Sequence, residues 1–159
     1  MSTWEEFAAD APEFARAVRS VLDAHTNKLL ATLRRDGSPR ISGIETTFKD
    51  GELWLGMMGG SRKALDLRRD PRLALHSASP DPDEPSKWPG DAKLAGRAVE
   101  VTDPATLEAF TSAEQPPGPF HLFRVDVTEV VLTRVGDPAD HLVIELWREG
   151  EGLRRFQRR

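Results

Sequence analysis

The first part of the chain carries apolar side chains at helical spacing. Apolar residues recur every three or four positions, which would place them along one buried stripe. Thr3 and Glu6 have the spacing of a capping box, and Pro12 is typical of the first turn of a second helix. Residues 3–25 are therefore predicted to form a short helical turn followed by a longer helix. The stripe consists of Phe7, Ala11, Phe14, Val18, Val21 and Leu22.

From Lys28 onward the pattern changes to the alternation typical of strands. Two short segments that contain Gly37 and Gly51 interrupt this alternation, and glycine there can take the positive φ that hairpin turns need. The pattern predicts an antiparallel meander of three strands, at 28–34, 40–48 and 52–58, with turns at 35–38 and 49–51.

The second half of the chain predicts further strands separated by helices and loops. Residues 79–90 contain four prolines and few apolar groups, so they are expected to form a long surface loop. The alternating segment 120–135 is long enough to bend around a barrel. The remaining expectations are helices at 61–69 and from Asp103 to about Ala113, a loop at 115–119, and strands at 72–77, 93–101 and 141–147. The fold class is thus mainly β (α+β): a small antiparallel barrel with helices at its ends.

Length and composition narrow the classes of protein. The 159 residues suit one domain, with helices at 3–25, a barrel core at 28–147 and a basic C-terminal tail at 148–159. A formal net charge of −4 disfavours nucleic acid as a partner, and no apolar run is long enough to cross a membrane. The absence of cysteine excludes disulfides, thiolate metal sites and cysteine nucleophiles, and the acidic N-terminus lacks a secretory signal. We therefore expect a cytoplasmic protein.

The segment from Met57 to Lys63 is the most informative for chemistry. Two glycines follow a predicted strand, and a predicted helix then begins with Ser61, Arg62 and Lys63. The free N–H groups at a helix start favour an anion, and an arginine can bind a phosphate with two nitrogens. The simpler alternative is an ordinary helix cap with two solvated cations. No nucleotide-binding glycine motif is present.

Arg40 is a second candidate for anion binding. It lies at the start of a predicted strand, with Ser42 on the same face two residues later. An arginine that points into a barrel needs an anion, whereas one that points outward needs only water. Its position in the strand leaves both alternatives open.

Two stretches together resemble the pyridoxamine 5'-phosphate oxidase-like family of flavin-binding proteins. The first is the strand Arg40-Ile41-Ser42-Gly43-Ile44, and the second is Ser61-Arg62-Lys63-Ala64 followed by Asp70-Pro71-Arg72. The resemblance covers about Lys28 to Val101. A weaker second part lies at the C-terminus, where Trp147, Gly150, Gly152 and the arginines after them look like the closing motif of that family.

The resemblance implies a split antiparallel β-barrel of about six to seven strands, and a homodimer with the cofactor at the subunit interface. The implied cofactor is FMN, with the deazaflavin coenzyme F-420 as the alternative. The implied contacts are Arg40, Ile41 and Ser42 with the phosphate or ring, Met57 and Met58 with the ring, and Ser61, Arg62 and Lys63 with the phosphate. Trp147 and one of the C-terminal arginines (Arg154, Arg155 or Arg158) would come from near the dimer interface.

The expected function is hydride transfer between this cofactor and a small organic substrate. Glu45 stands where the vitamin-metabolising oxidases carry a lysine, so it would repel a phosphorylated substrate and argues against pyridoxamine phosphate oxidation. No side-chain acid or base stands out, and the four scattered histidines do not predict a metal site. The alternative is a non-catalytic split-barrel protein that binds or senses a flavin, haem or a similar small anion.

Overall fold

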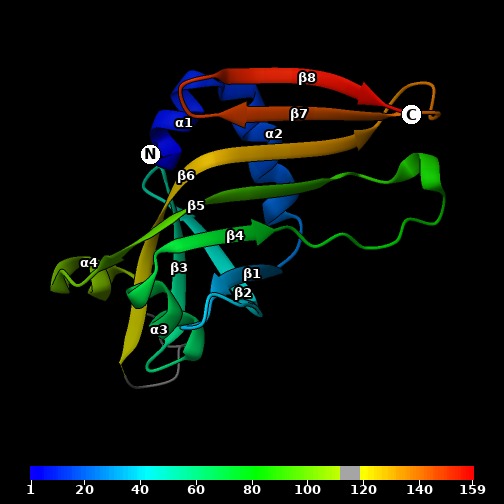
Figure 1. The fold of residues 1–159 in the computed structure, drawn as a ribbon. Helices are drawn as coiled ribbons and strands as arrows, with labels where there is room; N and C mark the ends of the chain where they lie inside the picture. The colour runs from blue at the N-terminus through cyan, green and yellow to red at the C-terminus, as the bar shows by residue number, and fades with distance from the viewer. Residues whose placement is uncertain (112–118) are drawn as a thin grey trace.

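The computed structural model describes residues 1–111 and 119–159. These residues form one eight-stranded antiparallel sheet with helices packed against it (Figure 1). The helices are α1 (Trp4–Asp10), α2 (Pro12–Asp23), α3 (Arg62–Arg69) and α4 (Pro104–Ala109), with a short 3-10 helix at Pro85–Lys87. The strands are β1 (Asn27–Leu33), β2 (Pro39–Lys49), β3 (Glu52–Met58), β4 (Arg72–His76), β5 (Asp91–Val101), β6 (Phe120–Val135), β7 (Leu142–Arg148) and β8 (Gly152–Arg158).

Six of the strands close into a barrel. They follow the order β3-β2-β1-β4-β5-β6, and an additional pairing between β3 and β6 completes the ring. Strands β7 and β8 extend the same sheet beyond β6, outside the barrel. This arrangement confirms the predicted split antiparallel barrel with N-terminal and peripheral helices.

The long strand β6 belongs to both parts of the sheet. Its residues 120–124 pair with β3 and close the barrel, whereas residues 129–135 pair with β7. A β-bulge against Ala95 and Gly96 of β5 lies between the two segments and bends the sheet there. At Gly96 a Cβ atom would lie only 2.0 Å from the carbonyl oxygen of Asp126, so the bulge requires glycine.

Replacing Gly96 by alanine is expected to destabilise the protein by about 2 kcal/mol, because the methyl group can fit only if the β5–β6 backbones separate. Gly43 supplies the matched control, since it also lies in a strand and a Cβ atom there meets nothing within 4 Å. Urea unfolding of Gly96→Ala and Gly43→Ala measures the difference. Equal midpoints for the two variants would contradict the steric role of Gly96.

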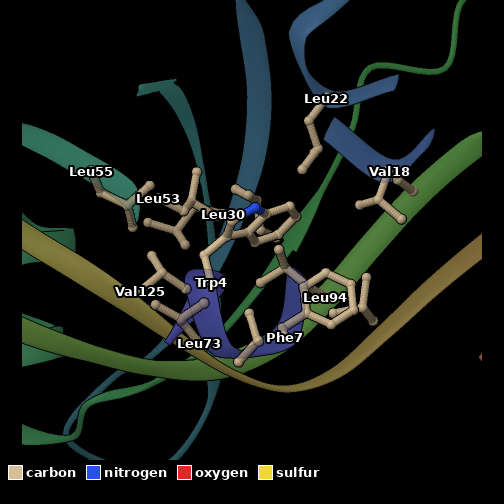
Figure 2. Packing of buried hydrophobic residues seen from close by; sticks show 14 of the residues in the cluster. Trp4, Phe7, Val18, Leu22, Leu30, Leu53, Leu55, Leu73, Leu94 and Val125 are labelled. Carbon is tan, nitrogen blue, oxygen red and sulfur yellow. The ribbon is translucent and has the colours of Figure 1, made fainter. Parts of the chain in front are cut away.

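The N-terminal helices behave as the sequence predicts. The Thr3–Glu6 capping box starts α1, and Pro12 is the first residue of α2. Trp4 and Phe7 of α1 and Val18 and Leu22 of α2 point into the core of the barrel, which Figure 2 shows from close by. The other labelled members of this core are Leu30, Leu53, Leu55, Leu73, Leu94 and Val125.

The C-terminal end differs from the prediction of a solvated basic tail. Residues 152–158 form strand β8, which pairs along its length with β7. Positive φ angles at Gly150 and Gly152 allow the tight turn between the two strands. The arginines tolerate a strand here because β8 is the exposed edge of the sheet, where their charges stay in water.

Helix α4 is also shorter than predicted. Asp103 caps it as expected, by accepting from the Thr106 N–H, but the helix ends at Ala109. Phe110 then leaves the helix axis and packs against the Trp54 ring, with 5.0 Å between the centroids. Most of the predicted loop 115–119 lies outside the described residues. None of the described helices is long and apolar enough to span a membrane.

Candidate functional site

A basic hollow lies between the β1–β2 hairpin and one face of helix α3. Its volume is about 520 Å³. Five arginines line it against two carboxylates, so its charge favours an anion. The lining residues are Arg34, Arg35, Asp36, Arg40, Arg62, Leu65, Asp66 and Arg69.

Asp66 is the buried anchor of this hollow, with 3% of its surface exposed. Its carboxylate accepts hydrogen bonds from Thr32 Oγ1 at 2.8 Å, Arg40 Nε at 2.7 Å and Arg69 Nη2 at 3.3 Å. Thr32 and Arg40 are cross-strand partners in β1 and β2, so one carboxylate of α3 joins both strands. Burial works against ionisation of Asp66, but the bonds from Arg40, Thr32 and Arg69 outweigh it and hold the pKa of the carboxyl below its usual value.

This network directs Arg40 toward the hollow. Its Nε is occupied by Asp66, and no other hydrogen bond of its guanidinium occurs within the described residues. The side chain is one-fifth exposed and lines the hollow together with Arg62. The terminal nitrogens of Arg40 therefore remain for an anion, in the fork geometry that suits a phosphate.

Replacing Asp66 by asparagine is expected to lower the free energy of unfolding by about 2 kcal/mol near neutral pH, because two guanidinium groups lose their anionic partner. The pKa of Asp66 is lower in the folded state, so its contribution is complete above the ordinary pKa of about 3.9 and is lost as the pH falls through the folded value. The difference between wild type and Asp66→Asn should hence be constant above about pH 5 and shrink below it. Urea unfolding across this range measures it, and a difference that persists at acid pH would contradict the charge-based explanation.

The turn before α3 leads directly into Arg62, the first residue of this helix that lines the hollow. Gly60 has a φ of 73°, and its N–H donates to Nε2 of His121 at 3.1 Å. Ser61 occupies the N-cap position, but no side chain of residues 1–111 or 119–159 caps the helix there. The buried Oγ of Ser61 finds no hydrogen-bond partner among the described residues. An unpartnered hydroxyl beside uncapped helix N–H groups is the arrangement that an anion would complete.

The structure brings several of the predicted cofactor residues together around this hollow. Arg40 and Arg62 both line it, and Ser61 begins the helix that forms its wall. Lys63 lies against β2, with its Nζ donating to the carbonyl of Gly43 at 3.3 Å. Ser42 is half-buried and shares its face of β2 with Arg40.

Two other predicted cofactor contacts, Ile41 on β2 and Met58 on β3, present apolar side chains to solvent, with 73% and 75% of their surfaces exposed. Met57 is different: it is buried in the core, with 3% of its surface exposed. Because neighbours on a strand point to opposite faces, only Met58 is accessible to a ligand. Met57 is thus the methionine of this pair that packs in the core.

The two predicted C-terminal contacts do not join the hollow. Trp147 is buried in the core, where it packs edge-on against Phe7 and its Nε1 donates to Asp10 at 2.7 Å. The indole thus packs against α1 in the core, and its place near a dimer interface stays a prediction. Arg158 lies on the edge strand β8, over the Phe156 ring, and is absent from the lining of the hollow.

Sequence reasoning missed six residues of the hollow and the histidine that contacts Gly60. Arg34 ends a segment predicted only as a strand, and Arg35 and Asp36 belong to the predicted hairpin turn; their position beside α3 is set by the closed barrel. In the sequence, nothing distinguishes Asp66 and Arg69 from the ordinary polar residues of a short helix. The only signal for them was their spacing of four and seven residues after Arg62, which places all three on one helical face.

A second, largely apolar groove lies on the outer face of the sheet. Cross-strand pairs run Ile41–Ala31–Ala74–Ala95 across four strands and continue to Glu129 on β6. The next row of pairs joins Leu29, His76 and Lys93. All of these residues line the groove, whose volume is about 470 Å³.

Comparison with known proteins agrees with this geometry. The family model described as pyridoxamine 5'-phosphate oxidase matches residues 14–134, well over half of the chain. The comparison with curated protein sequences finds no match.

Solved structures share the fold at low sequence identity. A pyridoxamine 5'-phosphate oxidase-related, FMN-binding protein from Nostoc punctiforme superposes with a TM-score of 0.63 at 16% identity, over 94% of this chain and 96% of its own. PhzG from Burkholderia lata, in complex with tetrahydrophenazine-1-carboxylic acid, gives 0.60 at 15% identity, over 92% and 88%. An F-420 reductase gives 0.54 at 22% identity, over 70% and 94%. With a matching family model, a closed split barrel and the arginine-lined hollow, the chain belongs to the pyridoxamine 5'-phosphate oxidase-like split-barrel family.

Proposed function

We propose that the protein is an oxidoreductase that binds FMN, with the phosphate in the basic hollow, and transfers hydride between the flavin and a small organic substrate. The hollow itself is the observation that carries this proposal. Five arginines line the hollow along one face of α3, and the buried hydroxyl of Ser61, just before this helix, lacks a partner within the described residues. These donors fit a phosphate monoester, which presents oxygen acceptors and up to two negative charges.

The residues of this chain would hold and orient the cofactor. Arg40 and Arg62 would bind the phosphate, and the N–H groups at the start of α3 would add neutral donors. The exposed side chain of Met58 would cover the apolar ring and exclude water from it. The bound flavin would supply the hydride chemistry at its ring, as is usual for such cofactors. The deazaflavin coenzyme F-420 also carries a phosphate, so the same donors suit it.

The test is to identify the cofactor and then look for turnover. The purified protein is titrated with FMN and with F-420, and the reduced holoprotein is then mixed with candidate oxidants while the flavin absorbance is followed. Tight FMN binding with substrate-dependent reoxidation is expected. Binding without reoxidation faster than in free solution would favour a non-catalytic flavin-binding protein. Binding of neither cofactor would refute the proposal.

We propose also that a second copy of the chain covers the outer apolar groove. The row of small residues at Ala31, Ala74 and Ala95 allows close approach of another sheet, and Ile41 offers an exposed apolar side chain beside it. Lys93 and Glu129 both line the groove, so two copies related by a twofold axis can pair opposite charges.

The replacement Ala74→Glu is expected to convert the proposed dimer into a monomer, because it places a carboxylate in the middle of the covered face. The exposed Ala9 of α1 supplies the control, Ala9→Glu, which adds the same charge away from the groove. Sedimentation equilibrium measures the mass of each variant. A wild-type monomer, or a dimer that survives Ala74→Glu, would contradict the assignment of this face.

A further inference from the structure

The turn before α3 depends on a side chain that has no part in the proposed phosphate contacts. His121, on β6, accepts the Gly60 N–H at its Nε2, and only 13% of its side chain is exposed. We infer that His121 is a positioning residue for the cofactor site, and that its protonation releases the Gly60 turn and weakens phosphate binding. This inference deepens the proposed function and rests on it, but the state of the turn can be measured without any cofactor.

Glu100, the second polar neighbour of His121, determines which ring nitrogen carries the proton. Nδ1 lies 3.3 Å from Oε1 of Glu100, whose carboxylate is held by Arg68 through Nε at 2.9 Å and Nη2 at 2.7 Å. The bonds from Arg68 outweigh the opposing effect of burial, with a smaller contribution from His121, and keep the pKa of Glu100 below its usual value. Glu100 therefore stays an acceptor across the neutral range, so the neutral imidazole carries its proton on Nδ1 and offers Nε2 to Gly60.

Protonation removes this acceptor. Both ring nitrogens then carry a proton, and the Nε2–H of His121 faces the N–H of Gly60. Among the described residues, the charged groups that face the ring are Glu100 of β5 and, behind it, Arg68 of α3, while the neighbouring Phe123 ring is neutral. The contact with Glu100 survives protonation, whereas the contact with Gly60 is lost.

The loss matters because Gly60 lies between two residues of the proposed site. Met58 precedes the turn and Ser61 follows it as the N-cap of α3, so a change in the turn displaces both. Gly59 is tied to the same side of the turn, where its N–H donates to the carbonyl of Pro119. Among the described residues, His121 thus helps to fix where α3 begins, through an acceptor that protonation would remove.

The direct test follows the Gly60 amide by NMR in the cofactor-free protein, as a protection factor against hydrogen exchange. Wild type is compared with His121→Gln, which keeps an acceptor and cannot be protonated in this range, and with His121→Leu, which has no acceptor. At about pH 8, wild type and His121→Gln should protect Gly60 and His121→Leu should not; at about pH 5.5 only His121→Gln should protect it. Protection in His121→Leu, or equal pH dependence in wild type and His121→Gln, would overturn the inference.

The second measurement is FMN affinity at the same two pH values. The phosphate of FMN itself gains a proton at about pH 6, which weakens binding in every variant. His121→Gln serves as the reference for this effect, because it binds the same FMN but has no imidazole to protonate. The fall in affinity from about pH 8 to about pH 5.5 should be about tenfold larger in wild type than in His121→Gln. Equal falls would refute the effect on the cofactor site. If no variant binds FMN while Gly60 behaves as expected, the flavin proposal fails and the anchoring of the turn by His121 stands.

Discussion

Replacing Arg40 and Arg62 together by alanine is expected to weaken FMN binding by about a thousandfold. Hydrogen bonds to a charged partner contribute about 1.5–3 kcal/mol each, and every 1.4 kcal/mol is about a factor of ten in affinity. Both guanidinium groups line the hollow, and Asp66 already fixes the orientation of Arg40, so little ordering is left to oppose binding. Each single replacement should therefore cost about tenfold to a hundredfold.

Riboflavin separates the phosphate contact from a general loss of structure. It has the same ring and lacks the phosphate, so its affinity should be almost equal in wild type and in Arg40→Ala/Arg62→Ala. The matched control, Arg16→Ala/Arg97→Ala, removes the same charge from two exposed arginines outside the lining of the hollow, and it should leave FMN binding within about threefold of wild type. Fluorescence titration measures all of these affinities. Equal losses for FMN and riboflavin would show that the hollow does not bind the phosphate.

The largest expected effect on stability is that of Phe7→Ala, with a loss of about 4 kcal/mol. Phe7 is fully buried and joins α1 to α2 and β7 through edge-to-face contacts with Trp4, Phe14 and Trp147, whose ring centroids lie 4.7–5.9 Å away. Alanine would leave a cavity where these three rings meet, because they belong to three different elements and cannot close together without moving the helices.

Phe156→Ala is the control for this stability prediction. Phe156 lies on the edge strand β8 and keeps 38% of its surface exposed, so its removal should cost about 1 kcal/mol or less. Urea unfolding followed by tryptophan fluorescence gives both values. Similar losses for the two variants would contradict the role of α1 as part of the barrel core.

Local patterns in the sequence predict most of the strands and turns of the fold. The alternation from Lys28 onward and the glycines at Gly37 and Gly51 predict the three-strand meander because side-chain period and turn chemistry are local properties. The C-terminal strand was missed because its run of arginines lacks an apolar alternation. It is stabilised instead by pairing with β7, which is a property of the assembled sheet.

The sequence predicts those site residues that belong to one local pattern. It does not predict residues whose role depends on contacts between segments that the barrel brings together. Ser61 and Arg62 follow from the strand–glycine–helix pattern, and Arg40 joined them through the family resemblance. Asp66 and His121 could not be found in this way, because their importance arises from contacts with residues 26 and 61 positions distant. Trp147 was predicted from the C-terminal motif alone, and that motif does not reveal its contacts with Phe7 and Asp10 in the core.

The most direct test of the phosphate assignment is the relative affinity of the wild-type protein for FMN and riboflavin. Isothermal titration of both ligands under one condition compares two molecules that differ only in the group the hollow would bind. FMN should bind at least about a hundredfold more tightly than riboflavin, as expected for two or more charge-assisted hydrogen bonds. Equal affinities would show that the arginines around Asp66 serve another purpose and would contradict the proposed function.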